Sequence, residues 1–134
     1  MMTTKPTIES GKRKSAIAKA IIKKGTGKVK INNMNISIYE PKIARLKLME
    51  PMILAGKLAE KYDINLSVIG GGVMGQTMAA RLALARTLVE VEPKLKEVFL
   101  EYDRQLLVAD IRRRESSKPN CHGQARSKRQ KSYR

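Results

Sequence analysis

The sequence predicts an α+β fold of the α/β-sandwich type, in which helices cover one face of a single sheet. Short segments with alternating apolar residues come first, over 15–39, and segments with helical periodicity follow from residue 41. A β-branched apolar run at 64–69 lies between the helical segments. The length of 134 residues and the 42% hydrophobic content suit one domain with a real core.

The N-terminal half predicts a small antiparallel meander of three strands. In 15–24, basic and β-branched residues alternate with mostly alanine, which indicates a strand with a small-residue inner face. The glycines of 25–27 predict a turn before a strand at 28–31. Asn32 and Asn33 predict a second turn, because Asn tolerates positive φ, and a third strand follows at 35–39.

Helices dominate the second half. Pro41 and Pro51 each suit the first position of a helix, so we expect one helix after each. The expected remaining elements are a buried strand at 64–69, a helix with the apolar stripe Met74, Met78, Leu82, Ala85 and Val89, a helix from Pro93 to Tyr102, and a last strand at 106–109.

Charge divides the chain into three parts. We expect a polar, mobile N-terminal segment at 1–11, a globular domain at 12–111 and an extended basic tail at 112–134. The net charge is +16, and nine basic residues against one acid put half of it in the tail. The tail contains no Leu, Ile, Val, Met or Phe, so it lacks the apolar area that would offset its ordering entropy. Such a chain predicts a polyanionic partner, with nucleic acid first.

Several other classes of function find no support. No apolar run approaches the roughly 18 residues of a membrane span, and the N-terminus has no apolar signal region. The single cysteine, Cys121, excludes an internal disulfide and favours a reducing, cytoplasmic compartment. Cys121 and His122 cannot close a metal site alone, so we expect no metal, no cofactor and no catalysis. Local ion pairs are the expected use of Asp103, Asp110 and Glu115, which lie among the arginines at 104 and 112–114.

Gly70, Gly72 and Gly75 form a G-x-G-x-x-G pattern between an apolar run and a helix. A dinucleotide site also needs a second parallel strand ending in an acidic residue about 20 positions on. Glu90 and Glu92 stand at that distance, but they end a helix. Two interpretations stay open: a helix start that binds the phosphate of an RNA backbone, and a tight strand-to-helix turn.

Three segments resemble a known family. Lys12-Arg13-Lys14-Ser15-Ala16, the stretch GGGVMGQTMAARLALARTL at 70–88 and the ending RQKSYR at 129–134 resemble the universal small-subunit ribosomal protein nine. The last four residues resemble its archaeal and eukaryotic branch, and the likeness runs from about Ser10 to the C-terminus. Thr87 and the segment 118–123 depart from the family pattern.

The resemblance implies a fold like domain two of ribosomal protein five, with a mixed sheet, a left-handed β-α-β crossover and helices on one face. It implies a non-enzymatic structural component of the small-subunit head, bound to rRNA of the 3′ major domain and to neighbouring head proteins. It also implies that the tail reaches the anticodon stem-loop of P-site tRNA through Lys131, Ser132, Tyr133 and Arg134.

We expect the rRNA contacts at basic residues and at the glycine loop: Lys12, Arg13, Lys14, Gly70, Gly71, Gly72, Gln76, Arg81, Arg86, Arg112, Arg113, Arg114, Lys118, Arg126, Lys128 and Arg129. Two alternatives remain, a general nucleic-acid binder and a small nucleotide-dependent enzyme. A general nucleic-acid binder should not comigrate with small subunits in a high-salt sucrose gradient, whereas a ribosomal protein should. A nucleotide-dependent enzyme would be revealed by equilibrium binding of NAD or ATP.

Overall fold

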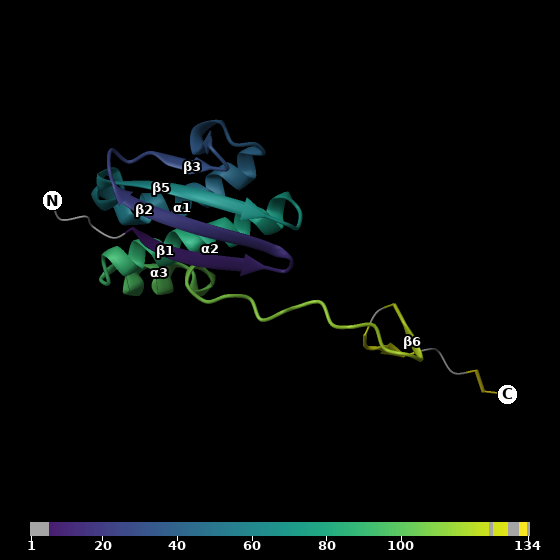
Figure 1. Ribbon diagram of the computed structural model, residues 1–134. Coiled ribbons are helices and arrows are strands. Elements are labelled where there is room, and N and C mark those ends of the chain that lie inside the picture. The colour runs from purple at the N-terminus through teal and green to yellow at the C-terminus, as the bar shows by residue number, and fades with distance from the viewer. Residues whose placement is uncertain (1–5, 124, 129–131, 134) are drawn as a thin grey trace.

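A mixed five-stranded sheet forms one layer, and three helices lie on one of its faces (Figure 1). The computed structural model describes residues 6–123, 125–128 and 132–133. The strands of the sheet are β1 Thr7–Arg13, β2 Ala16–Lys24, β3 Val29–Ile31, β4 Met34–Asn35 and β5 Tyr62–Ile69. The helices are α1 Lys42–Ala55, α2 Val73–Val91 and α3 Leu95–Tyr102, with the 3-10 turns η1 Ile36–Ile38, η2 Gly56–Lys61 and η3 Arg104–Leu106.

The strand order is β1-β2-β5-β3-β4, so the predicted antiparallel meander is wrong, because β5 lies between β2 and β3. Among the strands in the described residues, only β3 and β5 pair in parallel, and α1 forms the crossover between them. The α+β class and the helices on one face are therefore confirmed. No helix in the described part of the chain is long and apolar enough to cross a membrane.

Small residues allow α2 to lie close to the sheet. Ala16, Ala18 and Ala20 on the inner face of β2 are fully buried, as the alternation predicts. Gly11 of β1 faces the backbone of α2, where a Cβ atom would lie 2.3 Å from the Ala79 carbonyl oxygen. The core thus depends on glycine and alanine at the contact between strand and helix.

The predicted N-terminal boundary is wrong. Residues 7–11 belong to β1, which pairs antiparallel with β2 in the register Thr7↔Ile22 to Arg13↔Ala16. The segment looks polar because only one of its faces is covered, and glycine fills the position closest to α2.

The two helices expected around Pro51 are one helix, α1. Pro51 lies inside it and is buried with Ala44, Leu48 and Ala55. Packing of this face compensates for the backbone hydrogen bond that proline cannot make.

Two predicted strands differ from the structure. After β4 the chain turns into η1, because the Asn35 side chain accepts a hydrogen bond from the Ser37 N–H at 3.2 Å. The strand expected at 106–109 is replaced by η3 and irregular chain, since Asp103 caps the turn through the Gln105 N–H at 2.9 Å. A polar side chain that binds its own backbone competes with strand pairing in both places.

Beyond Asp110 the chain leaves the body of the domain (Figure 1). The described part of 112–134 is not uniformly extended, because β6 Cys121–His122 and β7 Ser127–Lys128 pair as a short antiparallel ladder.

Candidate nucleic-acid interface

The turn between β1 and β2 presents two exposed side chains, Lys14 and Ser15. Lys14 has φ 53°, a left-handed conformation that glycine or asparagine adopts more readily. A non-glycine residue in such a conformation is common at functional sites, where the surrounding structure maintains the strain.

The glycine loop packs against this turn. Gly70 and Gly71 have φ 76° and 66°. A Cβ atom on Gly70 would lie 2.7 Å from the Ser15 carbonyl oxygen, and one on Gly71 would lie 3.0 Å from the Cβ atom of Ala16. The chain's own backbone therefore explains these two glycines. Gly72 differs, because its φ is −100° and a Cβ atom there would meet nothing within 4 Å.

The N-terminus of α2 follows directly, with Gly72 as its N-cap and no side-chain capping hydrogen bond. The first helical bond runs from the Gln76 N–H to the Gly72 carbonyl at 2.9 Å, and Gln76 Nε2 donates to the Gly70 carbonyl at 3.1 Å. The preceding N–H groups of the first turn have no helical acceptor, and the helix dipole adds positive potential there. A groove of about 310 Å³ opens here, lined by Arg13, Lys14, Ser15, Gly71, Gly72, Met74, Gly75 and Met78.

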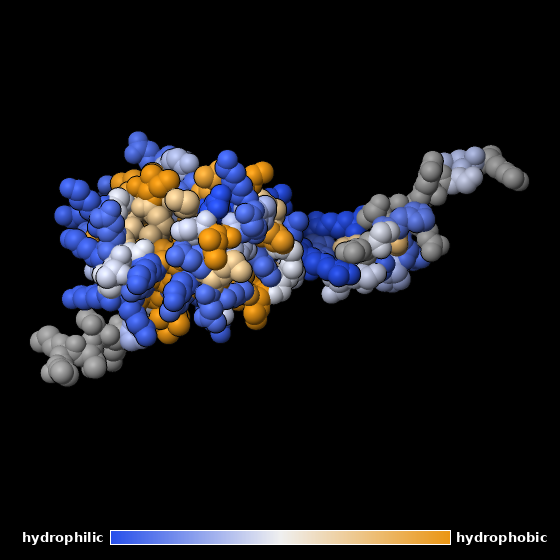
Figure 2. Space-filling model, turned by 90° about the horizontal axis from the view of Figure 1, so that it is seen from above, coloured by the Kyte–Doolittle hydropathy of each residue, from blue (hydrophilic) through white to orange (hydrophobic). Residues whose placement is uncertain are grey.

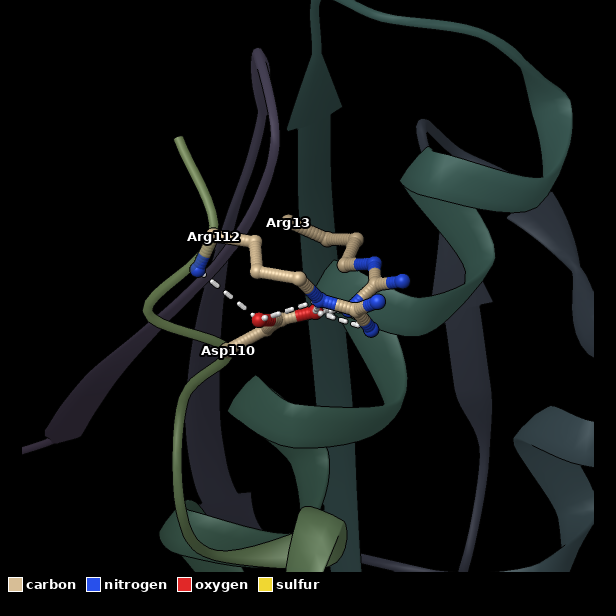
Figure 3. A network of polar contacts seen from close by, with 3 residues as sticks. All are labelled: Arg13, Asp110 and Arg112. Atoms are coloured by element: carbon tan, nitrogen blue, oxygen red, sulfur yellow. Dashed lines mark hydrogen bonds and ion pairs between the residues drawn. The ribbon is translucent and has the colours of Figure 1, made fainter. Parts of the chain in front are cut away.

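The start of the tail is fixed beside the same turn. The Asp110 carboxylate pairs with Arg13 of β1 and with Arg112, whose Nη2 lies 3.1 Å from Asp110 Oδ2 (Figure 3). The Arg112 N–H also donates to Asp110 Oδ1 at 2.9 Å. This contact places Arg113 and Arg114 beside the β1–β2 turn.

A second groove of about 680 Å³ results, lined by Lys12, Lys14, Ser15, Arg112, Arg113 and Arg114. Lys14 and Ser15 line both grooves, so the two adjoin at the turn. The sequence predictions at 12–14, 70–72 and 112–114 therefore meet in one place, which we call the basic groove. Its long side chains and free helical N–H groups are donors suited to phosphate oxygens.

Two arginines predicted as nucleic-acid contacts are occupied inside the protein. Arg81 is 4% exposed, and its two terminal nitrogens each lie 3.0 Å from Asp103 Oδ2. It also pairs with Glu50 of α1. The expectation of a surface contact at Arg81 is wrong, because its guanidinium joins α1 and α2 to the α3–η3 junction at Asp103 instead. Arg86 is half-buried and donates to the Ser10 carbonyl at 2.9 Å and to the Leu107 carbonyl at 3.2 Å.

The surroundings of Asp103 shift the pKa of its carboxyl group in two directions. Partial burial raises the pKa of Asp103, but the Gln105 N–H and the Arg81 guanidinium outweigh that effect, so the pKa is lowered overall. The expected local ion pair with a neighbouring arginine is confirmed for Asp110, which pairs with Arg112. For Asp103 it is wrong, because Asp103 pairs with the distant Arg81. Glu115 pairs with Lys118 and with Arg126 instead of the arginines at 112–114.

Glu115 organises the tail beyond the basic groove. Its carboxylate accepts a hydrogen bond from Arg126 Nε at 2.9 Å, and the same carboxylate lies 3.9 Å from Lys118 Nζ. The side-chain hydrogen bond from Arg126 lowers the pKa of Glu115. Two predicted RNA contacts, Lys118 and Arg126, thus lie around one carboxylate.

Of the remaining predicted tail residues, Ser132 and Tyr133 are exposed and Lys128 belongs to β7. The predictions for Arg129, Lys131 and Arg134 lie outside the described residues. The Cys121 thiol lies 3.6 Å from the Ala125 carbonyl oxygen. Among the described residues, no three His, Cys, Asp or Glu side chains group in a way that could hold a metal ion.

The predicted RNA contacts did not include the lysines on the uncovered face of the sheet. Lys19 and Lys23 of β2 and Lys30 of β3 are exposed there. The alternation in β2 was the available signal, because the residues opposite its buried alanines had to face outward.

Comparison with known proteins decides the family. The family model for ribosomal protein S9/S16 matches residues 11–134. The chain belongs to the ribosomal protein S9/S16 family. This family is structural and non-enzymatic.

Archaeal members of the S9/S16 family are similar over nearly their whole length, and each is named small ribosomal subunit protein uS9. The protein of Methanothrix thermoacetophila is 51% identical over 93% of this chain and 96% of its own. The Pyrobaculum aerophilum protein is 48% identical over 98% of this chain and 94% of its own length. The Methanococcus maripaludis protein is 50% identical over 92% of this chain and 95% of its own length.

Proposed function

We propose that this chain is a structural component of the small ribosomal subunit in the cytoplasm, where it binds rRNA through the basic groove. The observation that carries the proposal is the convergence of Lys12, Lys14 and the 112–114 arginines with the uncapped start of α2. Membership of the S9/S16 family supports an rRNA partner. We further propose that this rRNA is the 3′ major domain, which places the protein and its protein neighbours in the subunit head.

The groove suits a sugar-phosphate backbone rather than base edges. Its donors are guanidinium, ammonium and backbone N–H groups, which bind phosphate oxygens without regard to sequence. The described lining of the two grooves contains no aromatic side chain on which a base would stack. Folded rRNA, with phosphates in a fixed arrangement, is a partner that such a groove can select by shape.

We propose that the C-terminal residues Lys131, Ser132, Tyr133 and Arg134 contact P-site tRNA at the anticodon stem-loop. Two features support this role. The tail leaves the body of the domain (Figure 1) beside the basic groove, and 23 residues at about 3.3 Å each span at most roughly 75 Å, a length that the pairing of β6 and β7 shortens. A contact with phosphate would suit every tRNA, because it does not depend on sequence.

The parallel pair β3 and β5 also bears on the fold proposed from the resemblance. Both strands point to the right in Figure 1, β3 lies above β5 and α1 lies behind the sheet. This arrangement supports the left-handed crossover of the domain-two fold of ribosomal protein five.

The salt dependence of rRNA binding tests the groove. We expect the variant Arg113→Ala/Arg114→Ala to bind a 3′ major domain rRNA fragment more weakly. The slope of log K against log salt concentration should become shallower by about 1.5, because each of the two lost phosphate contacts contributes about 0.7–0.9 to it. Lys57→Ala/Lys61→Ala, which removes two exposed charges of η2, is the matched control. Equal slopes for the two variants would contradict the groove, and equal binding of duplex DNA would favour a general nucleic-acid binder.

Deletion of residues 131–134 tests the tail. We expect the truncated chain to enter small subunits, which then bind P-site tRNA more weakly. The variant Arg134→Lys keeps the terminal charge and serves as the control. Unchanged P-site affinity after the deletion would contradict the proposed tRNA contact.

A further inference from the structure

Helix α1 is apolar on two opposite faces. Ala44, Leu48, Pro51 and Ala55 are buried against the core. On the other side Ile43, Leu46, Met49 and Ile53 point outward, and Ile43 and Ile53 are 63% and 70% exposed. Their spacing of three and four residues places them on one face of the helix, which we call the α1 ridge.

A surface helix normally carries polar residues on its outer face, and a helix that is apolar all round is normally buried. The ridge departs from this pattern over three turns. Met34 of β4 and Ile38 of η1 are also exposed. Figure 2 views the molecule from the side of β3 and shows hydrophobic groups at the surface between charged ones.

The charges that helix α1 itself carries are mostly positive. The exposed acids Glu40 and Glu60 lie beyond its ends, whereas α1 contains the basic residues Lys42, Arg45 and Lys47. Its one acid, Glu50, pairs with the buried Arg81 and does not offset them at the surface. A partner that complements this surface is apolar at its centre and acidic at its rim.

We propose that the α1 ridge is the docking surface for a neighbouring protein of the small subunit, which presents an apolar helix or strand bordered by Asp and Glu. The inference rests on the proposed function, since it requires assembly into a subunit. RNA fits the ridge poorly, because interfaces with nucleic acid are polar and four aliphatic side chains would face phosphate and ribose. The tail of this chain fits no better, as its sequence from residue 112 contains no Leu, Ile, Val, Met or Phe.

Photo-crosslinking in purified small subunits identifies the occupant. A benzophenone amino acid replaces Ile53, and in a matched control it replaces Ser67, which is exposed on the opposite, uncovered face of the sheet. We expect the Ile53 position to crosslink to one protein, through a peptide that combines apolar and acidic residues. A crosslink to rRNA, a crosslink to a second copy of this chain, or none would overturn the proposal.

Charge variants test the predicted rim. We expect Ile43→Asp/Ile53→Asp to lower incorporation in cells that also carry the wild-type chain, by about tenfold, and Ile43→Lys/Ile53→Lys to lower it less. Equal incorporation of both variants and wild type would overturn the proposal, and so would a larger loss for the lysine variant. Both variants should bind the naked rRNA fragment within about twofold of wild type, which separates a failure of the ridge from a failure of the basic groove.

Discussion

Substitution of Gly72 by serine should raise the stability of the free protein and lower its affinity for RNA. Gly72 occupies the N-cap of α2 with φ −100° and ψ 175°, the extended backbone of a normal cap. Serine ranks above glycine at this position, because its hydroxyl accepts a hydrogen bond from an N–H of the first turn. The Gly72→Ser side chain would meet nothing within 4 Å at its Cβ atom.

The magnitude of the Gly72→Ser effect follows from these facts. The cap contributes a few tenths of a kcal/mol. Loss of glycine's freedom in the unfolded chain adds about 0.4–1 kcal/mol. We therefore expect the free protein to gain about 0.6–1.4 kcal/mol, a rise of several degrees in Tm for a domain of this size.

RNA affinity should change in the opposite direction. The serine hydroxyl accepts a hydrogen bond from an N–H group that would otherwise donate to a phosphate oxygen. The added Cβ atom also fills space that glycine leaves open. Loss of one hydrogen bond to a charged group costs about 1.5–3 kcal/mol, which corresponds to roughly a 10- to 100-fold weaker Kd. Urea unfolding and filter binding to the rRNA fragment measure the two quantities on the same preparation.

Gly71→Ala is the control for the reasoning on stability. At φ 66°, with its Cβ atom 3.0 Å from that of Ala16, it should lose about 2–3 kcal/mol. Equal rRNA affinity of Gly72→Ser and wild type would refute the close approach of RNA to this loop. Equal stability of Gly71→Ala and wild type would refute the packing argument.

Four further substitutions test the packing and the ion pairs. Gly11→Ala should cost about 3 kcal/mol in urea unfolding, because its Cβ atom overlaps the α2 backbone, and a loss under about 0.5 kcal/mol would contradict this. Arg81→Met should cost about 3 kcal/mol at pH 7, since it leaves two carboxylates without their guanidinium; a neutral result would show that those carboxylates are solvated. Glu115→Gln should lower the protection factors of the amides in β6 and β7. In the wild type the Arg126 pair lowers the Glu115 pKa, so the protection factors should persist above its ordinary value of 4.5 and fall as pH drops through the lower folded value. Protection factors that stay constant across this range would exclude the role. Asp110→Asn should weaken binding to the rRNA fragment although it raises the net charge, and stronger binding would show that charge matters more than placement.

Local patterns predicted the elements whose two faces differ. The alternation in β2 identified its buried alanines because one face of the sheet is uncovered. The stripe predicted for α2 was only partly correct, since Met74 is exposed while Thr77 and Thr87 are buried. Helix α2 contacts the sheet, α1 and α3, so more than one of its faces is covered. The hydroxyls of the buried threonines donate hydrogen bonds to backbone carbonyls four residues earlier. A hydrophobic pattern counts threonine as polar, so it does not predict that these residues are buried.

The basic groove was predicted as a set of residues but not as one place. Lys14 and Arg113 are about a hundred positions apart, and only the paired strands and the Asp110 contact bring them together. Arg81 looked like a surface residue because its two carboxylate partners, Glu50 and Asp103, are 31 and 22 positions away. Sequence spacing carries no signal for pairs formed by tertiary packing.

The placement of carboxylates explains which cations remain available to RNA. Asp110 lies in the most basic part of the chain and removes one unit of positive charge, which opposes anion binding. Its contacts with Arg13 and Arg112 nevertheless fix the root of the tail against β1, so the exposed side chains of Arg113 and Arg114 begin from a defined position. Ordering a flexible basic segment before binding lowers the entropy lost on association, and this gain offsets one lost charge where several cations remain. The acidic residue is therefore consistent with a phosphate-binding groove, because it positions the arginines that would otherwise repel one another.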